Sequence, residues 1–239
     1  MLGPVAACAQ PSRCSGWPFG AVSPLHAQAL RKASVEMRPG APAAELRWRE
    51  SLEAFAASDR DRAPTLGGVV FVGSSSIRLW NDLEREFGTV TIVKRGFGGS
   101  RLSDCAGHVA QLVLPYKPRT VVVYAGDNDL AEGATPQGVL ASYTDFVARV
   151  REALPDTRIV FISIKPSPSR EALMPAAIQA NELIHDYVKR HPGLGYVDVY
   201  TKMIDAGGRP RAELFQADAL HLNAAGYSLW KAALAEHLR

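Results

Sequence analysis

The sequence predicts a doubly wound, flavodoxin-like α/β fold around a parallel β-sheet. Short apolar runs alternate five times with longer segments whose apolar residues recur at helical spacing. Two of these runs, at 119–126 and 158–164, are nearly continuous and rich in β-branched residues. Such runs are typical of strands that are buried on both faces of a parallel sheet. The 239 residues are 47% hydrophobic and 21% charged, which excludes wholesale disorder, collagen-like repeats and coiled coil.

Local signals place the elements in order along the chain. An amphipathic first helix is expected over 42–58, because apolar side chains recur there at near-helical spacing with charges between them. Strands are expected at 69–72, 90–93, 119–126, 158–164 and 196–200. Further helices are expected over 77–87, 104–114, 136–154, 170–190 and from 224 to the end, with a glycine-rich turn at 96–99. Thr135 is the predicted N-cap of the helix that starts at Pro136.

Residues 1–40 differ in composition from the rest and are expected to form a poorly ordered tail before a single domain, 41–239. They contain five prolines and four glycines with little periodicity. The formal net charge of +3 also belongs to this tail, since residues 41–239 carry 23 basic and 23 acidic side chains. A domain without a basic excess lacks the charge for a nucleic-acid groove, so nucleic acid is not an expected partner.

Targeting signals and cysteines constrain the compartment only in part. No apolar run approaches the roughly 18 residues of a membrane span, and no convincing signal peptide is present, which favours a soluble, cytoplasmic chain. Two alternatives stay open: residues 5–8 resemble a lipoprotein cleavage box, and Met37 could be the initiator. Cys8, Cys14 and Cys105 are odd in number and lack C-x-x-C spacing, so neither a disulfide framework nor a zinc site is expected.

Three consecutive serines follow the first predicted strand. Ser74, Ser75 and Ser76 come directly after Gly73, at a turn from strand to helix. Backbone N–H groups at such a turn favour negative charge, which suits a nucleophilic hydroxyl. A serine in this position is also a common helix N-cap, so the motif alone does not decide between the two.

Two further pairs of residues follow other predicted strands at the same edge of the sheet. Asp218 stands three residues before His221, so its carboxylate can bond the imidazole Nδ1–H and leave Nε2 to take a proton. The N–H of Gly99 and the side-chain amide of Asn128 can both donate to a developing oxyanion. Each pair also has a plain structural explanation as a surface turn. Together, however, they supply every role that acyl transfer needs.

These segments resemble the four sequence blocks of the SGNH hydrolases, also called GDSL-type esterases and lipases. The blocks occur in the family's order as FVGSSSIRLW, KRGFGGSRLSD, YAGDNDL and ADALHLNAAGY, over roughly 68–226. The resemblance implies a three-layer α/β/α sandwich with a five-stranded parallel sheet. It also implies a serine esterase that acts on a small-molecule ester and needs no metal or organic cofactor. Small or short-chain acyl groups are favoured because the chain is short and shows no evident lid insertion.

Carried over by position, the resemblance assigns the site residues. Ser75 matches the nucleophile, and Asp218 and His221 match the other members of a catalytic triad. The N–H groups of Ser75 and Gly99 and the Asn128 amide match the oxyanion hole. Two positions depart from the family pattern: Ser74 replaces the usual aspartate, and Ser100 follows the oxyanion glycine in place of Asp or Asn. Either Ser74 or Ser76 could therefore substitute for Ser75.

The sequence allows three other interpretations, and particular residues argue against the first two. A dinucleotide-binding fingerprint fails because Arg101 occupies the third glycine position and no acid occurs over 116–122. A nucleophile elbow of the α/β-hydrolase type fails because Ile77 replaces its second glycine. A catalytically inactive module for binding carbohydrate or protein is the third alternative. In the loop 165–170, Arg170 is expected to be solvated, with an acidic partner at the site as the alternative.

Overall fold

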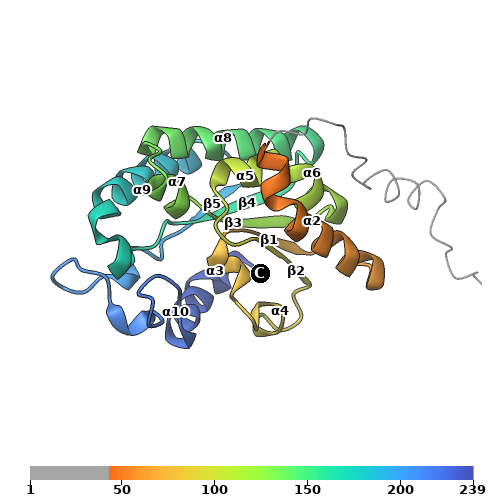
Figure 1. Ribbon diagram of the computed structural model, residues 1–239. Coiled ribbons are helices and arrows are strands. Elements are labelled where there is room, and N and C mark those ends of the chain that lie inside the picture. Colours follow the sequence, from red (N-terminus) through yellow and green to blue (C-terminus); the bar gives the residue numbers. More distant parts are fainter. Residues whose placement is uncertain (1–42, 239) are drawn as a thin grey trace, which may run out of the picture. The chain divides into compact units, whose positions relative to one another are not determined.

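The computed structural model describes residues 43–238. Its centre is a five-stranded sheet in which every pair of neighbouring strands is parallel, in the order β2-β1-β3-β4-β5 (Figure 1). The strands are β1 (Val69–Gly73), β2 (Ile92–Gly96), β3 (Thr120–Tyr124), β4 (Arg158–Ile162) and β5 (Leu194–Val197). This strand order confirms the prediction of a doubly wound parallel sheet. The tail predicted for 1–40 lies outside the described residues.

Helices follow nearly every strand. The α-helices are α2 (Ala43–Asp61), α3 (Ser75–Arg78), α4 (Leu83–Glu86), α5 (Leu102–Gly107), α6 (Val109–Leu112), α7 (Asp127–Ala131), α8 (Pro136–Ala153), α9 (Met174–Lys189) and α10 (Ala224–Leu234). Short 3₁₀ turns add η1 (Leu114–Tyr116), η2 (Pro168–Leu173), η3 (Thr201–Met203), η4 (Ala212–Leu214) and η5 (Ala235–His237). The Thr135 hydroxyl accepts a hydrogen bond from the N–H of Gly138 at 3.1 Å, which confirms the predicted cap of α8.

Each face of the sheet has its own hydrophobic core. Alternate residues of one strand point to opposite faces, so Val70 and Val72 of β1 enter one core while Val69 and Phe71 enter the other. The first core is covered by α2, α5, α6, α8 and α9, and the second by α3, α4 and α10 (Figure 1). The protein is therefore a three-layer α/β/α sandwich. No helix within 43–238 has both the length and the apolar character to cross a bilayer.

Several predicted elements have different bounds in the structure. The last strand, expected at 196–200, is β5 at Leu194–Val197, and three further elements differ because the apolar pattern was incomplete. The helix expected over 77–87 is two short helices, since Trp80 between them turns into the second core and is only 1% exposed. The strand expected at 90–93 is displaced to β2, whose end includes the charged Arg95. That side chain is buried because it donates to the Tyr116 hydroxyl at 2.7 Å and pairs with Asp59. The helix expected over 104–114 is interrupted at His108.

Close packing between β1 and β3 fixes the turn that carries the serines. Gly73 ends β1 with φ of +151°, and a Cβ atom there would lie 1.9 Å from the carbonyl oxygen of Tyr124 in β3. Only glycine fits this position. The sequence order of the strands reverses between β1 and β3, and ligands of open α/β sheets bind beside such a reversal, at the carboxyl ends of the strands.

Candidate active site

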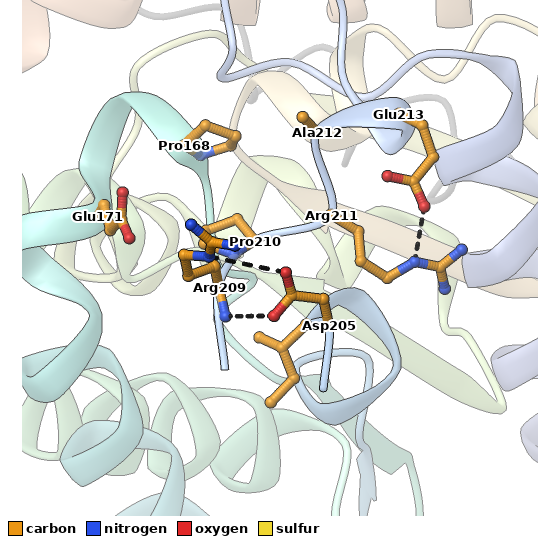
Figure 2. Close-up of a pocket in the computed structure, with 9 residues that line it drawn as sticks. Pro168, Glu171, Asp205, Arg209, Pro210, Arg211, Ala212 and Glu213 are labelled. Carbon is orange, nitrogen blue, oxygen red and sulfur yellow. Dashed lines mark hydrogen bonds and ion pairs between the residues drawn. The ribbon is translucent and has the colours of Figure 1, made fainter. Parts of the chain in front are cut away.

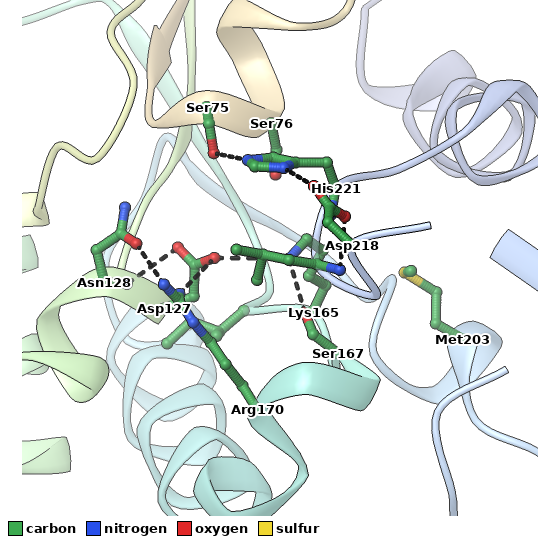
Figure 3. A network of polar contacts seen from close by, with 12 residues as sticks. Ser75, Ser76, Asp127, Asn128, Lys165, Ser167, Arg170, Met203, Asp218 and His221 are labelled. Carbon is green, nitrogen blue, oxygen red and sulfur yellow. Dashed lines mark hydrogen bonds and ion pairs between the residues drawn. The ribbon is translucent and has the colours of Figure 1, made fainter. Parts of the chain in front are cut away.

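The structure brings Ser75, His221 and Asp218 together in one row (Figure 3). The Ser75 hydroxyl oxygen lies 3.1 Å from Nε2 of His221, although the two residues are 146 positions apart in the chain. The other ring nitrogen, Nδ1, lies 2.5 Å from Oδ2 of Asp218. Both distances are within hydrogen-bonding range, so a proton can move from the hydroxyl to the imidazole while the carboxylate holds the ring.

One short turn positions both the carboxylate and the imidazole. Oδ1 of Asp218 accepts hydrogen bonds from the N–H groups of Leu220 at 3.0 Å and His221 at 2.9 Å. These donors, and above all the His221 N–H, hold the pKa of Asp218 well below its usual range. Gln216 closes the turn, because its N–H donates to the carbonyl of His221 at 2.7 Å. The carboxylate therefore stays ionised and oriented even though it is exposed to solvent.

Of the three serines, the one whose hydroxyl is within hydrogen-bonding distance of the imidazole is Ser75. Ser75 is half-buried at the start of α3, whereas Ser74 is fully buried and Ser76 is 1% exposed. The carbonyl of Ser76 accepts a hydrogen bond from the Tyr227 hydroxyl at 3.0 Å, which ties this turn to α10. Among the described residues, the hydroxyl of Ser74 has no hydrogen-bond partner. The geometry therefore favours Ser75 among the three predicted alternatives.

Two of the three predicted oxyanion donors, Gly99 and Asn128, lie on loops that are tied together. Gly99, half-buried, has φ of +80° in the turn after β2. Asn128 is buried in α7, directly after β3, and its Nδ2 donates to the carbonyl of Ser100 at 3.1 Å. Asp129 accepts the N–H of Leu102 at 2.9 Å, which adds a second link between the same two loops. These links fix the spacing between the glycine turn and the Asn128 amide.

Behind Asn128 lies an ionic network, of which the sequence analysis anticipated only an acidic partner for Arg170, and that as an alternative. Arg170, expected to be solvated, instead donates from Nη2 to Oδ1 of Asn128 at 2.9 Å and pairs through Nη1 with Asp127 at 3.2 Å. Lys165 lies 3.5 Å from the same Asp127 carboxylate and donates to the Ser167 hydroxyl at 2.9 Å (Figure 3). Burial lowers the pKa of Lys165, and the nearby carboxylate opposes that effect. The only sequence signal was two cations directly after a buried strand.

Nearby acidic side chains also have specific partners. Burial raises the pKa of Asp129 to about 6, and Asp104 pairs with Arg101 at 3.1 Å. Within residues 43–238, no three His, Cys, Asp or Glu side chains are grouped so that they could hold a metal ion. The contacts of Asp129 with the Leu102 N–H and of Asp104 with Arg101 hold the loop after β2 in place.

Comparison with known proteins decides the family. The model of the GDSL-like lipase/acylhydrolase family matches residues 71–229, about two thirds of the chain and all four sequence blocks. The chain belongs to the GDSL-like lipase/acylhydrolase family. It is therefore a carboxylic ester hydrolase, and the predicted relationship to SGNH hydrolases is confirmed. Among curated protein sequences, none matches this acylhydrolase at a significant level.

Solved structures with low sequence identity share the fold of this acylhydrolase. A Streptococcus pneumonia protein described in connection with platelet activating factor is 20% identical, with a TM-score of 0.70 over 80% of this chain and 92% of that one. A GDSL-like lipase from Bacteroides thetaiotaomicron is 20% identical, with a TM-score of 0.67 over 78% and 96%. An acetylxylan esterase from Geobacillus stearothermophilus is 13% identical, with a TM-score of 0.58 over 73% and 95%.

In this acylhydrolase, residues of η2 and of the segment 204–213 line a cavity of about 590 Å³ (Figure 2). Its charged side chains are mutually paired: Arg211 contacts Glu213 at 2.8 Å, and Arg209 contacts Asp205 at 3.7 Å. The N–H of Ser169 in η2 donates to the carbonyl of Ala219 at 3.1 Å, which joins one wall of the cavity to the turn that carries His221. Trp80 and Phe97 do not line this cavity, since both are buried in the hydrophobic cores.

Proposed function

We propose that this acylhydrolase is a serine esterase that hydrolyses small or short-chain acyl esters through a covalent acyl-enzyme. The observation that carries the proposal is the row of contacts from Ser75 through His221 to Asp218, with distances of 3.1 and 2.5 Å. A hydroxyl, a base and a group that orients the base are the minimum set for nucleophilic acyl transfer.

In the first half of the reaction His221 removes the hydroxyl proton of Ser75, and the oxygen attacks the ester carbonyl. Asp218 keeps the Nδ1 proton on the imidazole, so Nε2 is the basic nitrogen, and it stabilises the imidazolium that forms. His221 then gives the proton to the leaving alcohol. In the second half, the same imidazole activates a water molecule that releases the acid and restores the free serine.

The negative charge of the tetrahedral intermediate needs donors that are already in place. The N–H groups of Ser75 and Gly99 and the Asn128 amide are assigned to this role. The two links between the loop of Gly99 and the loop of Asn128 support the assignment. Donors that are held in place before the reaction need no reorganisation when charge develops. Losing one such donor typically raises the barrier by about 3–4 kcal/mol.

Acetyl esters are the first substrates to test. The acetylxylan esterase shares the fold, which makes acetylated sugars a reasonable screen beside p-nitrophenyl esters of increasing chain length. The expected result is a kcat/KM that falls as the acyl chain grows beyond a few carbons. A preference for long acyl chains would refute the short-chain part of the proposal.

Serine labelling tests the mechanism itself. A fluorophosphonate probe should label the wild-type protein and Ser74→Ala and Ser76→Ala variants, but not Ser75→Ala, and hydrolysis of p-nitrophenyl acetate should follow the same pattern. The neighbouring serines are matched controls, because both hydroxyls are buried in the same turn. Labelling that persists in Ser75→Ala and disappears in either neighbour would move the nucleophile. A folded wild-type protein with neither labelling nor hydrolysis would favour a binding module.

A further inference from the structure

We infer that Arg170 is a positioning residue that fixes and polarises the Asn128 amide so that it can donate to the oxyanion. Arg170 touches no reacting atom in this scheme, and its effect reaches the reaction through Asn128. The inference rests on the proposed function, because it concerns the same oxyanion hole, and it adds a residue from the loop after β4 to that site.

The two contacts of the Asn128 side chain determine which way the amide faces. A guanidinium group has only donors, so its contact at 2.9 Å must be with the amide oxygen, Oδ1. The Ser100 carbonyl has only acceptor capacity, so its contact at 3.1 Å must be with the amide nitrogen, Nδ2. Because both ends are occupied by partners of opposite kind, a flipped amide would lose both hydrogen bonds. The second N–H of Nδ2 is then available for the oxyanion.

Arg170 is itself held from behind. Its Nη1 pairs with Asp127 at 3.2 Å, and the same carboxylate lies 3.5 Å from Lys165, which is 3% exposed. Two cations thus share one carboxylate, and with Lys165 protonated the three groups sum to one positive charge behind Asn128. Charges in a buried network interact more strongly than in water, so this net positive charge acts on the Asn128 amide.

The chemical effect on the amide follows from the hydrogen bond that it accepts. A charge-assisted hydrogen bond to Oδ1 draws electron density from the amide and makes its N–H groups better donors, because linked hydrogen bonds polarise one another. The gain is larger when the acceptor carries a full negative charge than when it is a neutral carbonyl. Arg170 therefore favours the transition state over bound substrate, so its loss should lower kcat and leave KM nearly unchanged.

A double-mutant cycle separates this role from a merely structural one. Arg170→Met keeps the aliphatic stem and removes the donors, and it should lower kcat for p-nitrophenyl acetate about tenfold, with KM changed less than twofold. Asn128→Ala should lower kcat by about 10²-fold or more. The double variant should be no slower than Asn128→Ala alone, because Arg170 acts only through the amide. Arg170→Lys keeps a charged donor and should recover part of the loss.

Arg151 offers a matched control. Like Arg170 it has two acceptors, in this case the backbone carbonyl oxygens of Pro155 and Pro192. It lies at the end of α8, just before β4 begins, and so at the edge of the sheet opposite to the proposed active site. Arg151→Ala should leave kcat within twofold of wild type. Circular dichroism and the melting temperature of each variant show whether it is folded. If Arg170→Met is not folded, Arg170→Lys replaces it in the cycle, and the double variant of Arg170→Lys with Asn128→Ala should again be no slower than Asn128→Ala alone.

The outcomes distinguish the inference from the proposed function. Losses that multiply in the double variant, or an Arg170→Met kcat equal to wild type, would overturn the inference while the serine esterase proposal stands. A higher KM with an unchanged kcat in Arg170→Met would also overturn it and would make Arg170 a substrate contact. A folded wild-type protein without Ser75-dependent hydrolysis would overturn the proposed function, and this inference with it.

Discussion

Replacing Asp218 by asparagine tests whether this carboxylate sets the proton position on His221. Asparagine fits the turn, because its Oδ1 can still accept the N–H groups of Leu220 and His221 that Asp218 accepts at 3.0 and 2.9 Å. The amide NH₂ then occupies the place of Oδ2, 2.5 Å from Nδ1 of His221. An NH₂ group can only donate, so Nδ1 must become the acceptor and the ring proton moves to Nε2. In that tautomer the imidazole cannot take the proton of Ser75.

The expected loss follows from the exposure of the carboxylate. In a buried triad the same change costs about 10⁴-fold in kcat, through the wrong tautomer and the lost charge. Here the Asp218 side chain is 46% exposed, so water compensates for part of the lost charge, while the tautomer effect remains. We therefore expect kcat to fall by about 10²–10³-fold. The melting temperature should change little, because the turn keeps its backbone hydrogen bonds.

The assay is the hydrolysis of p-nitrophenyl acetate by Asp218→Asn and by a control, Asp205→Asn. Asp205 also accepts two backbone N–H groups in an exposed turn, those of Gly207 at 2.8 Å and Arg209 at 2.9 Å, but no imidazole contacts it in the described structure. The control should match wild type in kcat. An Asp218→Asn protein that is folded and within threefold of wild type would refute the tautomer argument and the role assigned to the carboxylate.

Two further predictions concern stability. Gly73→Ala would place a Cβ atom 1.9 Å from the Tyr124 carbonyl oxygen, so urea unfolding should show a loss of more than about 3 kcal/mol, whereas Gly67→Ala, with φ of +77° and open space around it, should lose only about 1 kcal/mol. Burial raises the pKa of Asp129 to about 6, so the folded state binds a proton that the unfolded state releases near pH 4. Stability should therefore fall as pH rises from 4 to 6, by up to about 3 kcal/mol, and Asp129→Asn should flatten that slope in melting curves.

The fold was predictable because the central strands are apolar on both sides. All five residues of β1 and of β3 are buried, and such runs show in the sequence as uninterrupted apolar stretches. β2 was misplaced because its end contains Arg95, which is buried only through partners on α2 and η1 that lie distant in sequence. A sequence pattern carries no sign of such a partner. The short α7 was missed because it directly follows a strand and reads as a polar loop.

The site was predictable to the extent that its residues follow strand ends. The distance between Ser75 and His221 depends on the meeting of loops 146 residues apart, and the family motifs were needed to expect it. The favoured interpretation of Arg170 as solvated was wrong and the alternative of an acidic partner at the site was right, because an arginine in a proline-rich loop gives no sign in the sequence of which partner it has. Its partners, Asp127 and Asn128, follow a different strand, so only the sheet order brings the three together.

The turn 216–223 contains both the acid and the base of the proposed triad, while the nucleophile lies at the start of α3, after β1. Its own contacts close it, since the Gln216 side chain donates to the Leu222 carbonyl at 2.8 Å and Phe215 bridges to Leu222. The aspartate and the imidazole therefore form one unit with its own internal geometry, and the hydrogen bond from the Ser169 N–H to the Ala219 carbonyl joins this unit to η2. The geometry within the acid–base pair and the distance from that pair to Ser75 are thus set by different contacts, and a substitution in η2 can alter the second without altering the first.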